Sequence, residues 1–255
     1  MLRIVLIGTG NVATQLAQAI VRHGDQLQLV QLYGRNRQHV QQLSQLVGDI
    51  PFTAQKDKVV QADLYLCSVK DDAIADALQG INFHSGTLAH TAGSVPMHVL
   101  TGMAAHIGVF YPLQTFSREK KVDFSKITAY IEANSEYSKL SLTLFANILC
   151  QNTRYVTSAT RARLHLAAVF ACNFANHLYA QADDLLKEAN IPFSDLLPLI
   201  DETVEKVHHL SPREAQTGPA RRKDKNIVTS QKGSLNGRQR EIYDLLSQSI
   251  WDYYD

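Results

Sequence analysis

The chain has 255 residues, of which 45% are hydrophobic, and its 25 lysines and arginines against 24 aspartates and glutamates give a formal charge of +1 at pH 7. A chain of this length can bury a full core and has room for two domains. The near-neutral balance creates no overall field toward nucleic acid or an anionic membrane, so neither is expected as a partner.

The cysteines and apolar stretches exclude several further classes. Cys67, Cys150 and Cys172 are too few and too scattered for a disulfide framework or a cysteine metal site, so we expect reduced core thiols and no bound metal. The apolar start of the chain is too short for a signal peptide. The longest later apolar stretch, 164–174, contains two polar residues and falls short of a membrane span. These features predict a cytoplasmic protein.

The first part of the chain alternates strand and helix patterns. Helices are predicted after Gly10, where Val12, Leu16 and Ile20 recur every fourth residue, and at 38–46, 71–78 and 136–149. Such alternation is typical of βαβ units with right-handed crossovers, and it predicts an open, twisted, parallel α/β sheet. The predicted strands cover residues 2–7, 27–33, 64–69, 87–91, 107–111 and 127–132, and residues 154–157 close the region.

The composition changes after Ser158. A long Ala- and Leu-rich helix is predicted at 164–189, and no strand pattern follows it. Further helices are predicted at 195–210, with Ser194 as N-cap, from about 226, and at about 238–253. The sequence therefore predicts an α/β domain over 1–157 and an all-helical domain over 158–255.

A glycine loop joins the first strand to the first helix. It reads Gly8-Thr9-Gly10-Asn11-Val12-Ala13. In a Rossmann-type turn the first glycine permits the tight turn, the second admits a pyrophosphate to the backbone, and a small third residue lets helix pack on strand. The helix N-terminus would then direct free N–H groups at the phosphates. We predict that residues 8–12, namely Gly8, Thr9, Gly10, Asn11 and Val12, bind a dinucleotide; the alternative is a tight turn that binds nothing.

The end of the second strand indicates which dinucleotide is bound. An acid there would bind the ribose 2′-hydroxyl of NAD, but the chain reads Tyr33-Gly34-Arg35-Asn36-Arg37. Guanidinium groups bond phosphate in a forked geometry and stack on adenine. Arg35, Asn36 and Arg37 therefore predict NADP rather than NAD, the alternative being an exposed basic pair that starts a helix.

Two more strand ends carry polar side chains. Because ligands bind beyond the carboxyl ends of parallel strands, these residues should line the same crevice. We assign Ser68, Val69 and Thr91 to the cofactor and Ser94 to the substrate, and His90 is a candidate catalytic group with packing or capping as its alternative role.

Three later segments complete a resemblance. They are Tyr111-Pro112-Leu113-Gln114-Thr115-Phe116, the helical segment LAAVFACNFANH at 166–177, and Thr217-Gly218-Pro219-Ala220-Arg221. With the glycine loop, they resemble the Rossmann-like proteins with a C-terminal DUF2520 domain, which are labelled as NADP oxidoreductases without an assigned reaction. The resemblance spans almost the full length of the chain.

That family is similar in architecture to pyrroline-5-carboxylate reductase and, more remotely, to β-hydroxyacid and 6-phosphogluconate dehydrogenases. Those relatives reduce C=N or C=O groups with a nicotinamide and usually dimerise through the helical domain. The resemblance therefore implies an NADP-dependent hydride transfer to a small substrate, and a homodimer. One feature departs from the relatives. If Asn173 matches the catalytic Asn of β-hydroxyacid dehydrogenases, Val169 replaces their Lys, so that mechanism is not expected. Many family members also have His at the position of Tyr111.

Hydride transfer to a carbonyl or imine needs a proton donor or strong hydrogen bonds at the reacting atom. The candidates on the long helix are Asn173, His165 and His177, and interior polar groups there would need a partner or a ligand. The structural alternatives are an interhelical hydrogen bond for Asn173 and satisfied core positions for the histidines.

The predicted substrate-binding residues come from several segments. Arg221 could bind a carboxylate, and Gly and Pro fix the path of its loop; the alternative is a basic loop that contacts a dimer partner or water. A different function is also open, an NADPH-binding sensor that acts through its helical dimer without turnover. The full substrate set is Ser94, Tyr111, Gln114, Thr217, Gly218 and Arg221.

Overall fold

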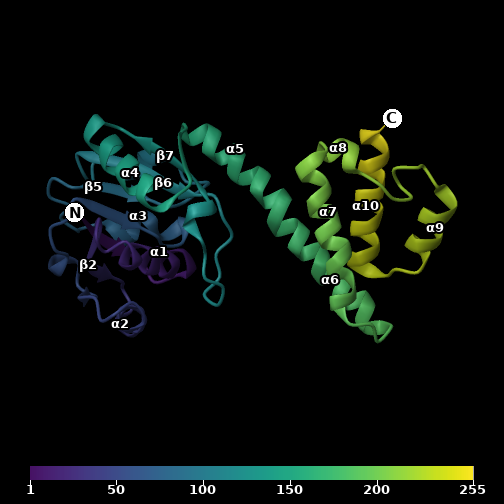
Figure 1. Ribbon diagram of the computed structural model, residues 1–255, viewed down its shortest axis with the longest axis horizontal. Coiled ribbons are helices and arrows are strands. Elements are labelled where there is room, and N and C mark those ends of the chain that lie inside the picture. Colours follow the sequence, from purple (N-terminus) through teal and green to yellow (C-terminus); the bar gives the residue numbers. More distant parts are fainter. Residues whose placement is uncertain (255) are drawn as a thin grey trace. The chain divides into compact units, whose positions relative to one another are not determined.

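The computed structural model describes residues 1–254, and the chain divides into two compact units, Met1–Cys172 and Asn173–Asp255 (Figure 1). The first unit contains a twisted sheet. Within residues 1–254 its strand order is β3-β2-β1-β4-β5-β6-β7-β8. The strands are β1 (Leu2–Ile7), β2 (Leu27–Tyr33), β3 (Phe52–Thr53), β4 (Leu64–Cys67), β5 (Thr87–His90), β6 (His106–Pro112), β7 (Thr128–Ala133) and β8 (Asn152–Tyr155).

Helices cover both faces of this sheet. The helices of the first unit are α1 (Asn11–Arg22), α2 (Arg37–Leu46), α3 (Ile74–Leu78), α4 (Glu136–Leu149) and α5 (Ser158–Ala168). In β1, Ile4 and Leu6 pack with α1, α2 and α4, while Val5 and Ile7 pack with α3 on the opposite face. A strand buried on both sides must be almost continuously aliphatic, which is the pattern that the sequence shows.

The predicted α/β sheet followed by helices is confirmed, with the last two strands, β7 and β8, running opposite to the other six. Six of the strand pairings are parallel in residues 1–254, but β7 runs antiparallel to β6. The expectation of a parallel sheet throughout is wrong here for a physical reason. Residues 113–127 between these strands contain only the 3₁₀ turn Phe124–Lys126, and without a crossover helix the chain returns in the opposite direction.

Local differences mark other segments. The helix predicted at 71–78 starts as a 3₁₀ turn, Asp71–Ala73. The long helix predicted at 164–189 begins earlier, at Ser158, where the Thr157 side chain caps it. It passes through a π-helical stretch, Val169–Phe174, before α6 (Ala175–Glu188). The exposed Cys172 lies in that stretch, so the prediction of a core thiol is wrong for this cysteine and right for Cys67 and Cys150.

The second unit is helical. After α6 and a 3₁₀ turn (Phe193–Leu196) come α7 (Leu197–His209), α8 (Pro212–Ala215), α9 (Lys225–Gly233) and α10 (Gly237–Tyr253). Ser194 lies inside the 3₁₀ turn, whose N-cap is Pro192, so the predicted cap is wrong. Few side chains of this unit are buried; Ala220, Val228 and Ser247 are among them. No helix of the described residues is long and apolar enough to cross a membrane.

Candidate functional site

The glycine loop has a backbone that residue 8 can adopt only as glycine. Gly8 has φ +122°, and a Cβ there would collide with the backbone carbonyl of Ser68 at the end of β4. The Gly8 amide donates to the carbonyl of Tyr33 over 2.8 Å, which holds the loop against the end of β2. The turn from β1 into α1 thus packs between the ends of β2 and β4.

Gly10, unlike Gly8, is not demanded by the fold, and it leaves space at the start of α1. It is the N-cap of α1 in an extended conformation, φ −79°, and a Cβ there would meet nothing within 4 Å. No side chain of residues 1–254 caps this helix, and no acid lies in its first turn. The first hydrogen bond of the helix joins Thr14 N–H to the Gly10 carbonyl, so the three preceding amides have no partner within the helix. A diphosphate fits this cradle because it would accept those N–H groups and complement the positive end of the helix dipole.

The predicted 2′-phosphate residues lie next to this loop. Gly34 brings the end of β2 against Thr9, whose Cγ2 lies 3.0 Å from where a Cβ of residue 34 would be. Arg35 and Arg37 are exposed, and the Arg37 guanidinium lies 5.6 Å from the ring centroid of Phe52. The Asn36 side chain accepts the His39 N–H over 3.1 Å and caps α2, which gives this residue a structural role.

One acid near these arginines was not foreseen. Asp76, on α3, pairs with Arg35 at 2.5 Å, with 57% of the arginine and 68% of the aspartate side chain exposed. An ion pair this exposed contributes little, and a phosphate dianion is a stronger partner for a guanidinium than one solvated carboxylate. The pair therefore holds Arg35 only weakly and leaves it available to another anion.

The ends of β4 and β5 bring together the other predicted polar groups. The Thr91 hydroxyl donates to the Ser68 hydroxyl over 3.2 Å, and Val69 Cγ1 lies 3.2 Å from the position of a Gly8 Cβ. The Ser94 hydroxyl donates to the carboxylate of Asp71. These side chains follow the carboxyl ends of β4 and β5, and their binding roles stay predictions.

His90 is enclosed at the end of β5. It is fully buried, and its Nδ1 accepts the Ala92 N–H over 3.2 Å, which places the proton of the neutral ring on Nε2. Burial, aided by the nearby Arg161, lowers the pKa of His90 to about 4. The imidazole is therefore neutral at pH 7 and packed within the unit, and its catalytic role stays a prediction.

Tyr111 and His165 form a hydrogen-bonded pair that the sequence did not connect. The Tyr111 hydroxyl lies 3.0 Å from His165 Nδ1, and the two rings meet edge to face with centroids 5.9 Å apart. Gly93 makes this approach possible, since a Cβ there would lie 2.6 Å from His165 Nδ1. Burial raises the pKa of Tyr111 above its usual value, so this hydroxyl stays protonated at neutral pH. The pair joins the end of β6, the loop after β5 and α5.

A buried ion pair fixes the helix that carries His165. The Arg161 guanidinium, one turn before His165, donates to the carboxylate of Glu132 on β7 and, over 2.5 Å, to the carbonyl of Val95. The Ser158 amide and hydroxyl donate to the same carboxylate over 3.0 and 2.7 Å. Arg161 has no exposed surface, so this network holds the start of α5 on the sheet. Sequence reasoning did not find it.

The remaining predicted site residues lie at the surface. Asn173 and His177 are exposed, so the premise that they are interior polar groups is wrong: within residues 1–254, nothing buries these two side chains. Gln114 is also exposed, and its side chain accepts the Thr115 N–H.

In the second unit, the 217–221 loop is ordered by its own contacts. Gly218 has φ +105°, and the Thr217 carbonyl accepts the Gln216 side-chain N–H over 2.9 Å. The Arg221 guanidinium stacks 4.2 Å from the ring centroid of Tyr254.

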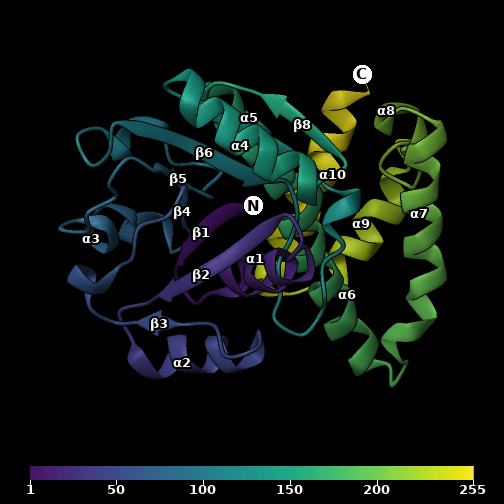
Figure 2. The same cartoon turned by 60° about the vertical axis from the view of Figure 1, so that its left-hand side comes forward.

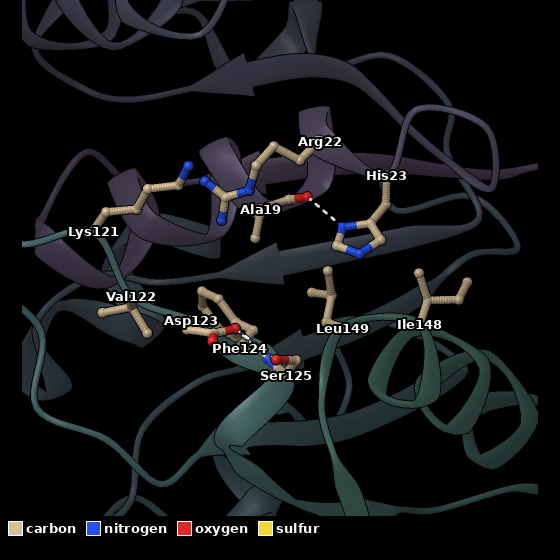
Figure 3. Close-up of a pocket in the computed structure, with 10 residues that line it drawn as sticks. All are labelled: Ala19, Arg22, His23, Lys121, Val122, Asp123, Phe124, Ser125, Ile148 and Leu149. Atoms are coloured by element: carbon tan, nitrogen blue, oxygen red, sulfur yellow. Dashed lines mark hydrogen bonds between the residues drawn. The ribbon is translucent and has the colours of Figure 1, made fainter.

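A separate cavity of about 420 Å³ opens at the other end of α1 (Figure 3). It is lined by Ala19 and Arg22 of that helix, by its C-cap His23, by residues 121–125 and by the end of α4. The His23 imidazole bonds the Ala19 carbonyl and turns its other edge toward the opening. Three helical turns separate this cavity from the glycine loop, so it is not the dinucleotide crevice.

Together, the fold and the glycine loop define a Rossmann-type dinucleotide-binding protein with a helical C-terminal unit. Two family models match the chain: "NADP oxidoreductase coenzyme F420-dependent" over residues 3–90 and "Domain of unknown function (DUF2520)" over residues 127–250. A crystal structure of a "putative NADP oxidoreductase" from Bacteroides fragilis is 43% identical with a TM-score of 0.90, and the match covers 98% of each chain. The chain therefore belongs to the DUF2520 family of Rossmann-like NADP oxidoreductases.

More distant solved structures share the fold. A pyrroline-5-carboxylate reductase from Streptococcus pyogenes matches with a TM-score of 0.66 and 13% identity over 98% of each chain. A reductive aminase from Aspergillus terreus, solved with NADPH and ethyl-5-oxohexanoate, matches with a TM-score of 0.65 and 12% identity over 82% of this chain and 74% of that one. Among curated proteins, none matches significantly.

Proposed function

We propose that the chain is an NADP-dependent oxidoreductase that reduces a C=O or C=N group of a small substrate. The observation that carries this proposal is the open, uncapped start of α1 behind Gly10, beside a strand end with two arginines and no acid. The two reductases with the same fold act on nitrogen-containing or carbonyl substrates by their names, which supports this reaction class. We do not favour a sensor without turnover.

The arginines after β2 support NADP over NAD. Arg35 is already held near the loop by Asp76, and Arg37 lies over Phe52. A 2′-phosphate carries more charge than the Asp76 carboxylate and accepts a forked pair of hydrogen bonds, so it would draw Arg35 away from that acid. Ser68, Val69 and Thr91 would then border the nicotinamide half of the same molecule.

We assign the proton-donor role to Tyr111, supported by His165. NADPH supplies a hydride when bound. The Tyr111 O–H bond breaks as its proton passes to the oxygen or nitrogen of the reduced group, which leaves a phenolate. His165, which is half-buried, then relays a proton from solvent: its Nδ1–H passes to the phenolate while Nε2 takes up a proton from solvent, so the ring stays neutral throughout. Asn173, His177, Gln114 and Ser94 remain candidates to orient the substrate, and Arg221 would bind a carboxylate if the substrate carries one.

Substitution of the two loop glycines tests the cofactor site. Gly10→Ala should fold with the wild-type melting temperature, because the new methyl group meets nothing within 4 Å, yet bind NADPH and NADH at least about 100-fold more weakly, since it fills the space of the diphosphate. Gly8→Ala, by contrast, should lower the free energy of unfolding by about 2 kcal/mol or more, and with it the melting temperature. Alanine is strained at φ +122°, and its methyl group meets the Ser68 carbonyl. Fluorescence titration and thermal denaturation measure both; undiminished binding by Gly10→Ala would contradict the proposed site.

The same titration tests the choice of coenzyme. Wild-type protein should prefer NADPH to NADH, and Arg35→Ala or Arg37→Ala should each remove about tenfold of that preference while leaving NADH unchanged. Equal affinity of the wild type for both coenzymes would refute the NADP assignment.

The reaction is tested by following NADPH oxidation with 2-oxo acids, cyclic imines and aldehydes. Tight binding with no oxidation of any of these would favour the sensor.

The helical unit supports a homodimer. Three apolar side chains on one face of α7 are 46–49% exposed, which is unusual for a helix in a stable monomer: Leu197, Val204 and Val207. A second copy could cover them, because identical apolar faces pair by two-fold symmetry. Light scattering should give twice the 28.4 kDa mass of the chain, and Val204→Glu with Val207→Glu should halve it; a wild-type monomer would refute this assembly.

A further inference from the structure

The loop that follows β6 is fastened to the helix of the glycine loop. It lies beside α1 in both views of the molecule (Figures 1 and 2). Gln15 of α1 is fully buried and makes three bonds to its backbone: Nε2 donates to the carbonyls of Ser117 and Lys120 over 2.8 and 3.1 Å, and Oε1 accepts the Val122 N–H over 3.0 Å. The Asn11 side chain adds a bond to the Phe116 carbonyl over 3.1 Å.

These bonds place one cation at the rim of the glycine loop. Arg118 Nη2 donates to the carbonyl of Thr9 over 3.1 Å, and Thr9 stands between the two glycines. The Arg118 side chain is exposed, and in the part of the chain that the structure describes no carboxylate pairs with it. It differs in this from Arg35, which Asp76 already holds. A lone carbonyl leaves most of the guanidinium donors to solvent.

We infer that Arg118 binds the diphosphate of the dinucleotide, as a residue of the site separate from the helix N-terminus and from the two arginines after β2. The inference rests on the proposed cofactor site. The glycine loop and the first turn of α1 offer only neutral N–H groups to a diphosphate, and Arg118 supplies the missing countercharge at that place. A forked guanidinium suits two phosphate oxygens better than it suits one carbonyl.

The buried anchor explains why this arginine can serve although it is on a loop. Ordering a flexible loop on binding costs conformational entropy, which reduces affinity. The bonds from Gln15 and Asn11 order residues 116–122 in the free protein, so ligand binding does not have to order this loop. Only the end of the Arg118 side chain then has to move from the Thr9 carbonyl to the phosphates.

Ligands that differ in their phosphates test the inference. Arg118→Ala should weaken NADPH and ADP by a similar factor of about ten, because both carry a diphosphate, and leave adenosine 2′-monophosphate unchanged because it has none. Arg118→Lys should recover part of the loss, since it keeps the charge without the fork. Lys121→Ala is the matched control: an exposed cation of the same loop that should leave all three affinities at wild-type values. Calorimetry measures the dissociation constants.

The outcomes separate this inference from the cofactor proposal. If Arg118→Ala binds NADPH and ADP as wild type does, or if it weakens adenosine 2′-monophosphate as strongly as the others, Arg118 only ties the loop to Thr9 and the inference is overturned. If wild-type protein binds ADP in an Arg118-dependent manner but binds NADPH no more tightly than ADP, the inference stands and the nicotinamide proposal fails.

Discussion

Glu132→Ala is expected to lower the free energy of unfolding by about 3–5 kcal/mol, the usual cost of leaving a buried charge without its partner. Arg161 has no exposed surface and its main counterion is the Glu132 carboxylate, whose side chain is 17% exposed. The same substitution removes both bonds from Ser158, so the first turn of α5 also loses its attachment to β7. Urea denaturation followed by circular dichroism measures the effect.

Two controls separate the buried charge from other causes. Glu136→Ala breaks an exposed pair with Lys139, 3.5 Å long and with the glutamate 82% exposed, and should change the stability little. The double variant Glu132→Leu with Arg161→Met replaces the buried pair by apolar side chains and should recover most of the loss. A Glu132→Ala protein as stable as the wild type would show that Arg161 finds another partner or water, and that the pair does not fix α5.

The sequence predicted the elements whose causes are local. The continuous aliphatic run of β1 follows from burial on both faces, and the spacing of Val12, Leu16 and Ile20 follows from the one face that α1 buries. The glycine loop was recognisable because its backbone conformation, with φ +122° at residue 8, needs glycine, and a glycine is visible in the sequence. The antiparallel direction of β7 could have been predicted, since the residues after β6 carry no helical pattern and a parallel connection needs a crossover.

The parts of the site that escaped prediction join distant residues. Tyr111 and His165 are 54 positions apart, and Glu132 and Arg161 are 29 apart, so each pair depends on where α5 crosses the sheet. Gln15 offered a signal, as a polar residue on the apolar side of α1, but its partners are backbone atoms about a hundred residues later. Asn173 and His177 were expected inside because an Ala- and Leu-rich helix favours burial; the chain alone leaves that face exposed.

Tyr111→Phe is expected to reduce the turnover of any substrate found in the panel by a factor of about 10²–10⁴, the usual contribution of a positioned acid. The substitution removes the hydroxyl that lies 3.0 Å from His165 Nδ1 and keeps the ring in contact with the imidazole. NADPH affinity should not change, because the diphosphate and ribose contacts belong to other residues. His165→Gln should lose less activity than Tyr111→Phe, since Tyr111 could then recover its proton from water.

The pH dependence distinguishes a proton donor from a structural tyrosine. Burial raises the pKa of Tyr111, and the active form is the protonated one, so the wild-type rate should stay level through the usual tyrosine range and fall only above it. That alkaline limb should be absent from the residual activity of Tyr111→Phe, whereas a merely packed tyrosine would leave it in place. Tyr155→Phe, which removes an exposed hydroxyl at the sheet edge, is the matched control and should keep both rate and limb. Wild-type turnover by Tyr111→Phe would transfer the proton-donor role to one of the helical candidates, and His177 would be the next residue to replace.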